Sequence, residues 1–324
     1  MAIRPIFIFS ITRSGSTLVQ RIVAAHEGVA TVSEPWLLLP LLYTLRSRGV
    51  VAEYSHNMAL SAIEDFCKEL PEGTEDYRRE LHDFVLRLYE KAAGQGATHF
   101  VDKSPPYYFV VGEIIRLFPE AKFVFLWRNP LSIVASIIET WHRGRWRSTA
   151  HSEDLFVGLP HLIATYRENL PHVHAVRFED LLAGDLELTW GGLMEYLEIP
   201  FDSQTLDRFP EVKLSGRAGD PVGVKAYSAL STEPMQKWKG TLANPLRREW
   251  CRRYLRYIGN ERLATMGYDG DQLIRELDSQ PAATASLIPD LGRMLNDLAR
   301  EPWRVQMRRR GVGGPNVVRK LLKA

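Results

Sequence analysis

Residues 7–26 read FIFSITRSGSTLVQRIVAAH: a short apolar run, a small polar turn and an amphipathic segment. The apolar run has the length and the aromatic and β-branched content of a buried strand. The apolar side chains after the turn share one face of a helix: Leu18, Val19, Ile22 and Val23. A strand and a helix joined by a turn rich in Gly and Ser are typical of a phosphate-binding loop.

The turn itself differs from the loop of a nucleoside triphosphatase. It consists of Ser14, Gly15, Ser16 and Thr17. Gly15 allows the backbone to approach an anion closely, and successive N–H groups can point at it. The Walker pattern would place a lysine at Ser16 and a glycine at Ser10, so hydrolysis of ATP or GTP is disfavoured. Arg13 supplies positive charge instead; an N-capped helix beside a surface arginine is the alternative interpretation.

Further apolar runs alternate with helical patterns along the chain. Residues 98–102 (THFVD), 122–127 (KFVFLW) and 174–178 (HAVRF) are each expected to form a buried strand. This alternation predicts a P-loop NTPase-like three-layer α/β/α fold with a parallel central sheet and helices on both faces. We expect this α/β domain to span residues 1–270, and a helical, basic C-terminal extension to span residues 271–324.

The remaining segments divide into expected helices and one expected loop. Two helices are predicted within residues 54–93, and further helices over 154–169, 186–197, 246–266 and 287–300. Residues 208–240 are rich in Gly, Pro and Ser and are predicted to form a long functional loop.

A second candidate anion site follows the strand at 122–127. Arg128 comes directly after that strand, at the carboxyl end where ligands bind in parallel sheets. Asn129 can cap the next helix and Pro130 fits its first turn. Ser136 follows two helical turns after Arg128, so an arginine and a hydroxyl can hold one phosphate. An ordinary strand-to-helix turn is the alternative.

Taken together, RSGSTL (13–18) and RNPLSIVAS (128–136) resemble the two nucleotide motifs of the PAPS-dependent sulfotransferases, closest to the bacterial and tyrosylprotein types. The resemblance runs from Pro5 to about Thr241. It includes AAHEGVATVSEPWLLLP (24–40), DKSPPYY (102–108), VRFEDLL (176–182) and GVKAYSALSTEPMQKWKG (223–240). Phe178 departs from it, because many members have tyrosine there, and Arg13 stands where many have lysine.

The resemblance implies a donor, 3′-phosphoadenosine 5′-phosphosulfate (PAPS), with adenosine 3′,5′-bisphosphate as the product and no metal. The first loop, from Arg13 through Ser14, Gly15, Ser16 and Thr17, would bind the 5′-phosphosulfate. Arg128 and Ser136 would bind the 3′-phosphate, and Lys225 would close over the donor. Glu34 is the expected general base. Arg13 and Lys103 are expected to stabilise charge on the leaving oxygens.

Other residues near the motifs have less specific expected roles. Trp36, Trp141 and Trp146 are candidates to shape a pocket for the hydroxyl-bearing acceptor. His26 and His99 are expected to be core or capping residues rather than bases. Arg177 is expected to form a structural salt bridge with Glu179 or Asp180. A carbohydrate, a lipid, a small metabolite and a peptide tyrosine all remain open as acceptors.

Charge and composition bear on location. The chain carries a net charge of +2, yet seven of its basic residues and no acidic ones lie in residues 302–324, which leaves −5 for the rest. We expect a cytoplasmic protein, because no signal peptide is visible and the apolar runs are too short to cross a bilayer. The basic tail can place it at an anionic membrane surface. Nucleic acid is a less favoured partner.

Two other functions fit parts of the pattern. A P-loop kinase-like phosphotransferase would use the first loop, although the missing lysine and the pairing of Arg128 with Ser136 argue against it. A non-catalytic nucleotide-binding protein would use the anion sites without Glu34 and Lys103. The nine histidines show no metal-ligand spacing.

Overall fold

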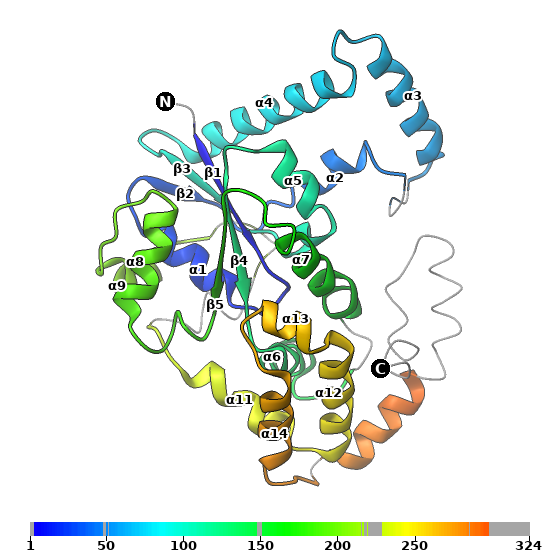
Figure 1. The fold of residues 1–324 in the computed structure, drawn as a ribbon, viewed down its shortest axis with the longest axis vertical. Coiled ribbons are helices and arrows are strands. Elements are labelled where there is room, and N and C mark those ends of the chain that lie inside the picture. Colours follow the sequence, from blue (N-terminus) through cyan, green and yellow to red (C-terminus); the bar gives the residue numbers. More distant parts are fainter. Residues whose placement is uncertain are drawn as a thin grey trace.

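The structure, a computed structural model, describes residues 3–47, 50, 52–147, 151–214, 216, 219, 229–284 and 286–297. Its centre is a five-stranded sheet in the order β2-β3-β1-β4-β5 (Figure 1). All neighbouring strands are parallel. The strands are β1 (Arg4–Phe9), β2 (Val29–Thr31), β3 (His99–Asp102), β4 (Lys122–Trp127) and β5 (Val173–Arg177).

The sheet is buried on both faces, which explains its apolar strands. Side chains alternate along a strand, so Phe7 and Phe9 of β1 face one core while Ile6 and Ile8 face the other. The first core is aromatic and includes α5 and α7; the second is aliphatic and includes α1 and α8. Figure 1 shows these helices on opposite sides of the sheet, as expected for a three-layer α/β/α fold.

Helices follow most strands and cover the sheet. Those in the first half are α1 (Ser16–Val23), α2 (Leu38–Tyr43), α3 (His56–Lys68), α4 (Thr74–Ala93), α5 (Val111–Leu117) and α6 (Pro130–His142). Those in the second half are α7 (Leu159–Tyr166), α8 (Leu186–Tyr196), α9 (Thr205–Arg208), α11 (Glu233–Thr241), α12 (Pro245–Ile258), α13 (Asn260–Thr265) and α14 (Gly270–Ser279). Residues 287–297 are also helical.

The structure differs from the sequence-based expectation in four places. Strand β2 was not predicted, since it has only three residues. Helix α11 occupies the last part of the expected loop 208–240. Trp238 is buried and the helix packs on α6, and this packing stabilises the helix despite the low helix propensity of its Pro and Gly residues. Residues 154–158 are π-helical rather than α-helical. The helix predicted over 246–266 breaks at Gly259, whose φ is 83°.

The C-terminal helices pack onto the preceding part of the chain. Helix α14 contacts α12 and α13, and its Leu273 and Leu277 belong to the aromatic core. Asp290 is fully buried and accepts a hydrogen bond of 2.7 Å from Nε of Arg247. The division at residue 270 therefore remains a prediction, with these contacts crossing it. The basic segment 302–324 lies outside the described residues.

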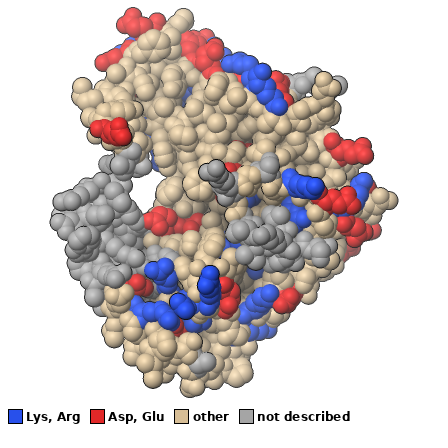
Figure 2. Space-filling view, turned by 180° about the vertical axis from the view of Figure 1, so that it is seen from behind, with Lys and Arg blue, Asp and Glu red and all other residues tan. Residues whose placement is uncertain are grey.

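Charge is mixed on the visible surface. Figure 2 shows basic and acidic side chains interspersed over the face that it draws. Many of the ion pairs join exposed residues that are close in sequence, such as Lys68 with Asp65 and Lys237 with Glu233. Pairs of this kind contribute about 0–1 kcal/mol each. The fold is held by its two cores rather than by these pairs.

Candidate active site

All five strands deliver a site residue at their carboxyl ends. In sheet order, β2 leads to Glu34, β3 to Lys103, β1 to the loop at Arg13, β4 to Arg128 and β5 to Phe178. Because the strands are parallel, these ends meet at one edge of the sheet, where open α/β sheets bind ligands. Residues up to 165 positions apart in sequence are thereby brought to one place.

The first loop has the backbone geometry of an anion site. Gly15 lies in the left-handed region with φ 90° and is the N-cap of α1, which begins at Ser16. A Cβ on Gly15 would lie 2.1 Å from Cε2 of Phe178, so no larger residue fits. The first N–H groups of a helix have no partner within the helix, and the helix dipole favours an anion beside them.

Arg13 joins the first loop to the second motif. Its Nε donates a hydrogen bond of 3.1 Å to Oγ of Ser136, and its guanidinium lies 5.5 Å from the ring of Trp141. Its carbonyl oxygen accepts a hydrogen bond of 2.7 Å from Nη1 of Arg128. Arg13 has φ 66°, an unusual value for a non-glycine residue. Functional sites are where such strain concentrates.

Arg128 is held from several sides. Its Nη2 donates to the carbonyl of Pro234 at 3.0 Å, and its guanidinium stacks 4.5 Å from the ring of Phe178. The adjacent Asn129 caps α6, since its side chain accepts from the N–H of Leu131. The phenylalanine that departs from the family pattern thus supports Arg128 by a cation–π contact.

Residues at the end of β5 and directly after it hold the second motif in place through hydrogen bonds. Glu179 accepts hydrogen bonds from the N–H of Asn129 at 3.1 Å and from the hydroxyl of Tyr268 at 2.6 Å. Arg177 pairs with Asp180 at 2.6 Å, which confirms the structural salt bridge expected there. These residues position Arg128 and do not line the cavity.

Lys103 and Glu34 form an ion pair. Nζ of Lys103 lies 2.6 Å from Oε1 of Glu34 and 3.3 Å from Oγ1 of Thr17, in the first loop. The two side chains are 2% and 12% exposed. Nε1 of Trp36 donates to Oε2 of Glu34 at 3.1 Å. Both carboxylate oxygens therefore have donors, and Lys103 bridges the carboxylate to the loop.

Asp102 stabilises the turn that carries Lys103. This buried carboxylate accepts hydrogen bonds from the hydroxyls of Tyr89, Tyr107 and Ser104, at 2.6, 2.9 and 3.0 Å. Ser104 in turn accepts from the backbone N–H of Trp36. Burial raises the pKa of Asp102 to about 6, although these hydrogen bonds and the charge of Lys103 oppose the shift.

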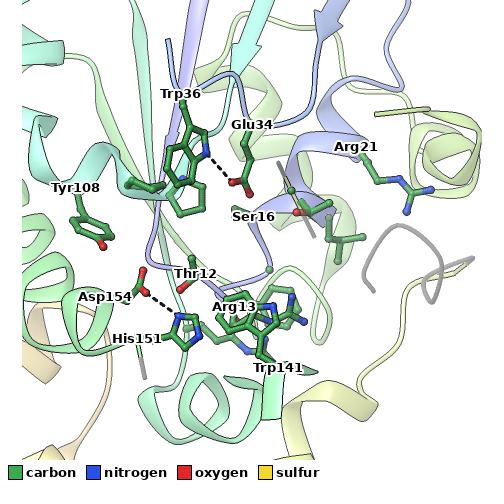
Figure 3. A pocket seen from close by; sticks show the side chains of 18 of the residues that line it. Thr12, Arg13, Ser16, Arg21, Glu34, Trp36, Tyr108, Trp141, His151 and Asp154 are labelled. Carbon is green, nitrogen blue, oxygen red and sulfur yellow. Dashed lines mark hydrogen bonds and ion pairs between the residues drawn. The ribbon is translucent and has the colours of Figure 1, made fainter. Parts of the chain in front are cut away.

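A cavity of about 690 Å³ opens above these residues (Figure 3). Arg13, Gly15, Ser16, Thr17, Arg128 and Glu34, all predicted from the sequence, line it. Figure 3 shows Arg21 and Ser16 on one side, Tyr108 and Asp154 on the other, and Arg13 between them. The size suits a nucleotide or a small molecule.

The other predicted residues lie around the cavity rather than in its lining. Ser14 and Lys103 are buried and are not part of the lining. Ser136 is not part of it either, but its hydroxyl accepts a hydrogen bond from Arg13, which is. Lys225 lies outside the described residues. Trp36 and Trp141 line the cavity, as expected. Trp146 was a wrong candidate, because it is buried in the core and packs edge-on against Trp250.

The histidines near the motifs are structural. Nδ1 of His26 accepts a hydrogen bond from the N–H of Gly28, which confirms a capping role. His99 is buried, and burial lowers its pKa. His151 and Asp154, which are not predicted from the sequence, line the cavity from the segment before α7. No local pattern marks them.

The described part of the chain has neither a cluster of metal ligands nor a helix suited to span a membrane. No group of three or more His, Cys, Asp or Glu side chains there is arranged to hold a metal ion. None of its helices combines the length and apolar character required of a membrane span.

Fold and site together define a P-loop-like α/β protein, in which a loop with the backbone geometry of an anion site lies beside the buried arginine at the end of β4. Residues 5–203 match the model of the Sulfotransferase family, and the chain belongs to that family. This confirms the resemblance drawn from the two motifs.

Individual relatives agree with this family. The chain is 32% identical over 137 residues to nodulation protein NoeE of Sinorhizobium fredii (strain NBRC 101917 / NGR234), which covers 42% of this chain and 31% of NoeE. It is 30% identical over 133 residues to a protein-tyrosine sulfotransferase of Drosophila melanogaster, and the match covers 41% of this chain and 25% of that protein. The chain thus matches less than a third of the length of these curated relatives.

A solved structure shows the same fold. The sulfotransferase domain from the curacin biosynthetic pathway superposes with a TM-score of 0.51 at 21% identity, covering 73% of this chain and 90% of that domain. The parallel three-layer architecture predicted from the strand and helix pattern is therefore confirmed.

Proposed function

We propose that this protein transfers a sulfuryl group from PAPS to an acceptor hydroxyl. The observation that supports this most directly is the link between the two anion sites, in which Arg13 contacts Ser136 through its side chain and Arg128 through its carbonyl. A donor with phosphates at both ends of one nucleoside needs two such sites at a fixed spacing. A triphosphate needs only one extended loop.

The residues present suit such a donor. Gly15 provides the left-handed backbone at the N-cap of α1, whose first N–H groups can donate to a phosphosulfate. Lys103 follows β3 and reaches the loop through Thr17, and Arg13 lies in the loop that follows β1. The donor supplies an activated sulfuryl group on its 5′-phosphate. The chain supplies positive charge where the leaving phosphate oxygen becomes negative.

Glu34 is the proposed general base. It lines the cavity, and Trp36 and Lys103 hold its carboxylate in place. As the acceptor oxygen bonds to sulfur, its proton passes to Glu34 while the bond from sulfur to the 5′-phosphate oxygen breaks. An anionic donor offers Lys103 a second partner, which would free Glu34 Oε1 to accept the proton.

The kinase-like alternative uses the same loop differently. Ser16 occupies the position of the Walker lysine, and Lys103 reaches the loop from a separate strand. No observation on the described residues favours phosphoryl transfer over sulfuryl transfer. The non-catalytic alternative leaves the buried contact between Lys103 and Glu34 without a use.

A thermal-shift titration with adenosine 3′,5′-bisphosphate, ADP and ATP separates these functions. A ligand at 100 times its dissociation constant adds about 2.7 kcal/mol of stability. We expect a shift with the bisphosphate at concentrations where ADP and ATP give none. Transfer of labelled sulfate from PAPS to an acceptor then tests the enzyme. A larger shift with ATP would favour the kinase-like function instead.

A further inference from the structure

The part of the cavity farthest from Arg21 has a different chemistry from the rest. Figure 3 shows Tyr108, Asp154 and His151 there, on the opposite side of Arg13 from Arg21 and Ser16. If the loop side takes the donor, as proposed above, this far side takes the acceptor. Its lining therefore carries information about acceptor class, which the sequence left open.

Asp154 is the most buried charged group on this side. Its side chain is 9% exposed, and Oδ2 lies 3.3 Å from Nδ1 of His151. Burial and the nearby carboxylate of Asp154 raise the pKa of the Tyr108 hydroxyl. Glu153, the next residue, also lines the cavity. The imidazole of His151 offers this buried carboxylate a positive charge only when it is protonated, so a permanently charged group that enters the cavity would be favoured beside Asp154.

Aromatic side chains line the same cavity as this carboxylate. Trp36 and Trp141 line the cavity, as do Tyr43 and Phe109 beside Tyr108. Trp36 remains 44% exposed, so its ring is available to a ligand. Ring faces attract cations, and recognition of ammonium groups by aromatic walls uses this attraction. A carboxylate among aromatic rings is the usual chemistry of an amine site, whereas an anionic acceptor would be repelled.

Two residues that line the cavity have strained backbone conformations, which the surrounding contacts hold in place. Trp36 has φ 53° and His151 has φ 60°, values that cost free energy for residues other than glycine. The N–H of Trp36 is held by Ser104, and the imidazole of His151 stacks 4.0 Å from Trp141. Asp154 begins a π-helical segment whose Gly158 lies against Tyr108, where a Cβ would be 2.7 Å from Cδ1. The carboxylate and its walls are thus fixed before any ligand binds.

We infer that the acceptor is a hydroxylated amine, whose ammonium group binds Asp154 beside the rings of Trp36 and Tyr108 while its hydroxyl faces Glu34. The inference rests on the proposed function, since it assigns the other end of the cavity to the donor. It narrows the acceptor from any hydroxyl compound to one that is cationic at neutral pH.

Matched ligands test the charge preference directly. The protein is saturated with adenosine 3′,5′-bisphosphate, and binding of two sets of hydroxyl compounds is measured by calorimetry. The first set is tyramine, 4-(2-hydroxyethyl)phenol and 4-hydroxyphenylacetate. The second is trans-4-aminocyclohexanol, trans-cyclohexane-1,4-diol and trans-4-hydroxycyclohexanecarboxylate. We expect the amine to bind at least about tenfold more tightly than the neutral alcohol in one or both sets, and the acid to bind most weakly.

Variants assign that preference to Asp154. Asp154→Asn should weaken binding of the amine about tenfold or more and leave the neutral alcohol within about twofold. Glu195→Gln removes an exposed carboxylate on α8, across the sheet, and should change neither. If Asp154→Asn does not fold, Trp36→Leu provides the second test, because loss of the ring face should weaken the amine more than the alcohol.

The outcomes are distinct. Equal or tighter binding of the alcohol or acid in both sets would overturn the inference, as would failure of both amines to bind at roughly 10 mM. An unchanged preference in Asp154→Asn would overturn the role of that residue. If adenosine 3′,5′-bisphosphate itself does not bind, the proposed function fails first. Binding of the bisphosphate without a preference for amines rejects the acceptor class alone.

Discussion

Nζ of Lys103 lies 2.6 Å from Oε1 of Glu34, although the two residues follow different strands and are 69 positions apart. The same ammonium group reaches Oγ1 of Thr17 in the first loop at 3.3 Å. One buried cation therefore connects the proposed base to the proposed donor site. Because Lys103 rather than Glu34 contacts the loop, we expect changes at Glu34 to lower turnover more than they lower donor affinity.

Replacement of Glu34 by glutamine tests its role as the base. Glutamine keeps the shape and can still accept from Trp36, but it does not take a proton. We expect turnover to fall about 10²–10⁴-fold, while affinity for adenosine 3′,5′-bisphosphate stays within about twofold. Single-turnover transfer of labelled sulfate measures the first, and calorimetry the second.

The matched control for this change is Glu27→Gln. Glu27 is an exposed carboxylate in the connection between α1 and β2, seven residues before Glu34, and it does not line the cavity. Its replacement should leave turnover unchanged. Near-normal turnover in Glu34→Gln would remove Glu34 as the base.

Arg128→Ala tests the second anion site. Loss of a charged hydrogen bond should weaken binding of adenosine 3′,5′-bisphosphate by about 1.5–3 kcal/mol. Arg128 also donates to the carbonyls of Arg13 and Pro234, so its removal can loosen the first loop as well. AMP, which lacks the 3′-phosphate, separates the two effects: its affinity should change much less. An equal loss for both nucleotides would make Arg128 a purely structural residue.

Gly15→Ala tests the close approach between the loop and Phe178. The new Cβ would lie 2.1 Å from Cε2 of a ring that is itself buried against Arg128, so neither can move freely. Gly184→Ala is the control, since Gly184 has a similar φ of 89° and open space around it. We expect Gly184→Ala to cost about 1–2 kcal/mol in urea unfolding, and Gly15→Ala about 1–3 kcal/mol more. Equal costs would show that the ring yields.

The fold was largely predictable because its strands are buried on both faces. PIFIF and KFVFLW are continuous apolar runs. When helical segments separate such runs, a buried parallel strand is the structure that they favour. Strand β2 escaped prediction because only Val29 of its three residues is buried. Helix α11 escaped because its stability depends on Trp238 packing on α6, which is a tertiary effect.

The site was predictable only where it follows local patterns. The first loop and the turn at Arg128 each combine a strand, a turn and a helix within a few residues. The contact between Lys103 and Glu34 depends on β2 and β3 being neighbours, which no spacing reveals. Asp154 and His151 enter the cavity from a segment without any motif. The acceptor side therefore required the structure.

Stability should depend on pH through Asp102. Its pKa is raised from 3.8 to about 6 in the folded state, so the folded protein binds the proton more tightly than the unfolded chain. This contribution is complete below about pH 3.8 and is lost as the pH rises through about 6. A shift of about two units corresponds to about 3 kcal/mol.

Asp102→Asn isolates that contribution, because asparagine does not titrate. The difference in unfolding free energy between the wild type and this variant should move in favour of the wild type by up to about 3 kcal/mol as the pH falls from 7 toward 4. Urea unfolding at several pH values measures it. A difference that stays constant would show that the hydroxyls of Tyr89, Tyr107 and Ser104 accommodate the ionised carboxylate fully.

The buried pair of Arg247 and Asp290 tests where the folded domain ends. Asp290 is 0% exposed and lies 20 residues beyond the predicted boundary at 270. Removing one partner of a buried pair costs about 3–5 kcal/mol, and Asp290 would keep only its contacts with Asn244 and the more exposed Arg293. We therefore expect Arg247→Ala to destabilise the protein by about that amount, as measured by urea unfolding. Arg253→Ala removes a partly exposed pair with Glu249 from the same helix and should cost less than about 1 kcal/mol.

Two truncations extend this test to the whole C-terminal segment. Ending the chain after residue 297 keeps Asp290 and should preserve both folding and binding of adenosine 3′,5′-bisphosphate. Ending it after residue 270 removes α14 and Asp290, uncovers the apolar face of α12 and leaves Arg247 without its buried partner. That shorter chain should unfold at a markedly lower urea concentration or not fold at all. If it instead keeps wild-type stability, residues 1–270 form an independent domain, as the sequence predicts, and the contacts across the boundary contribute little.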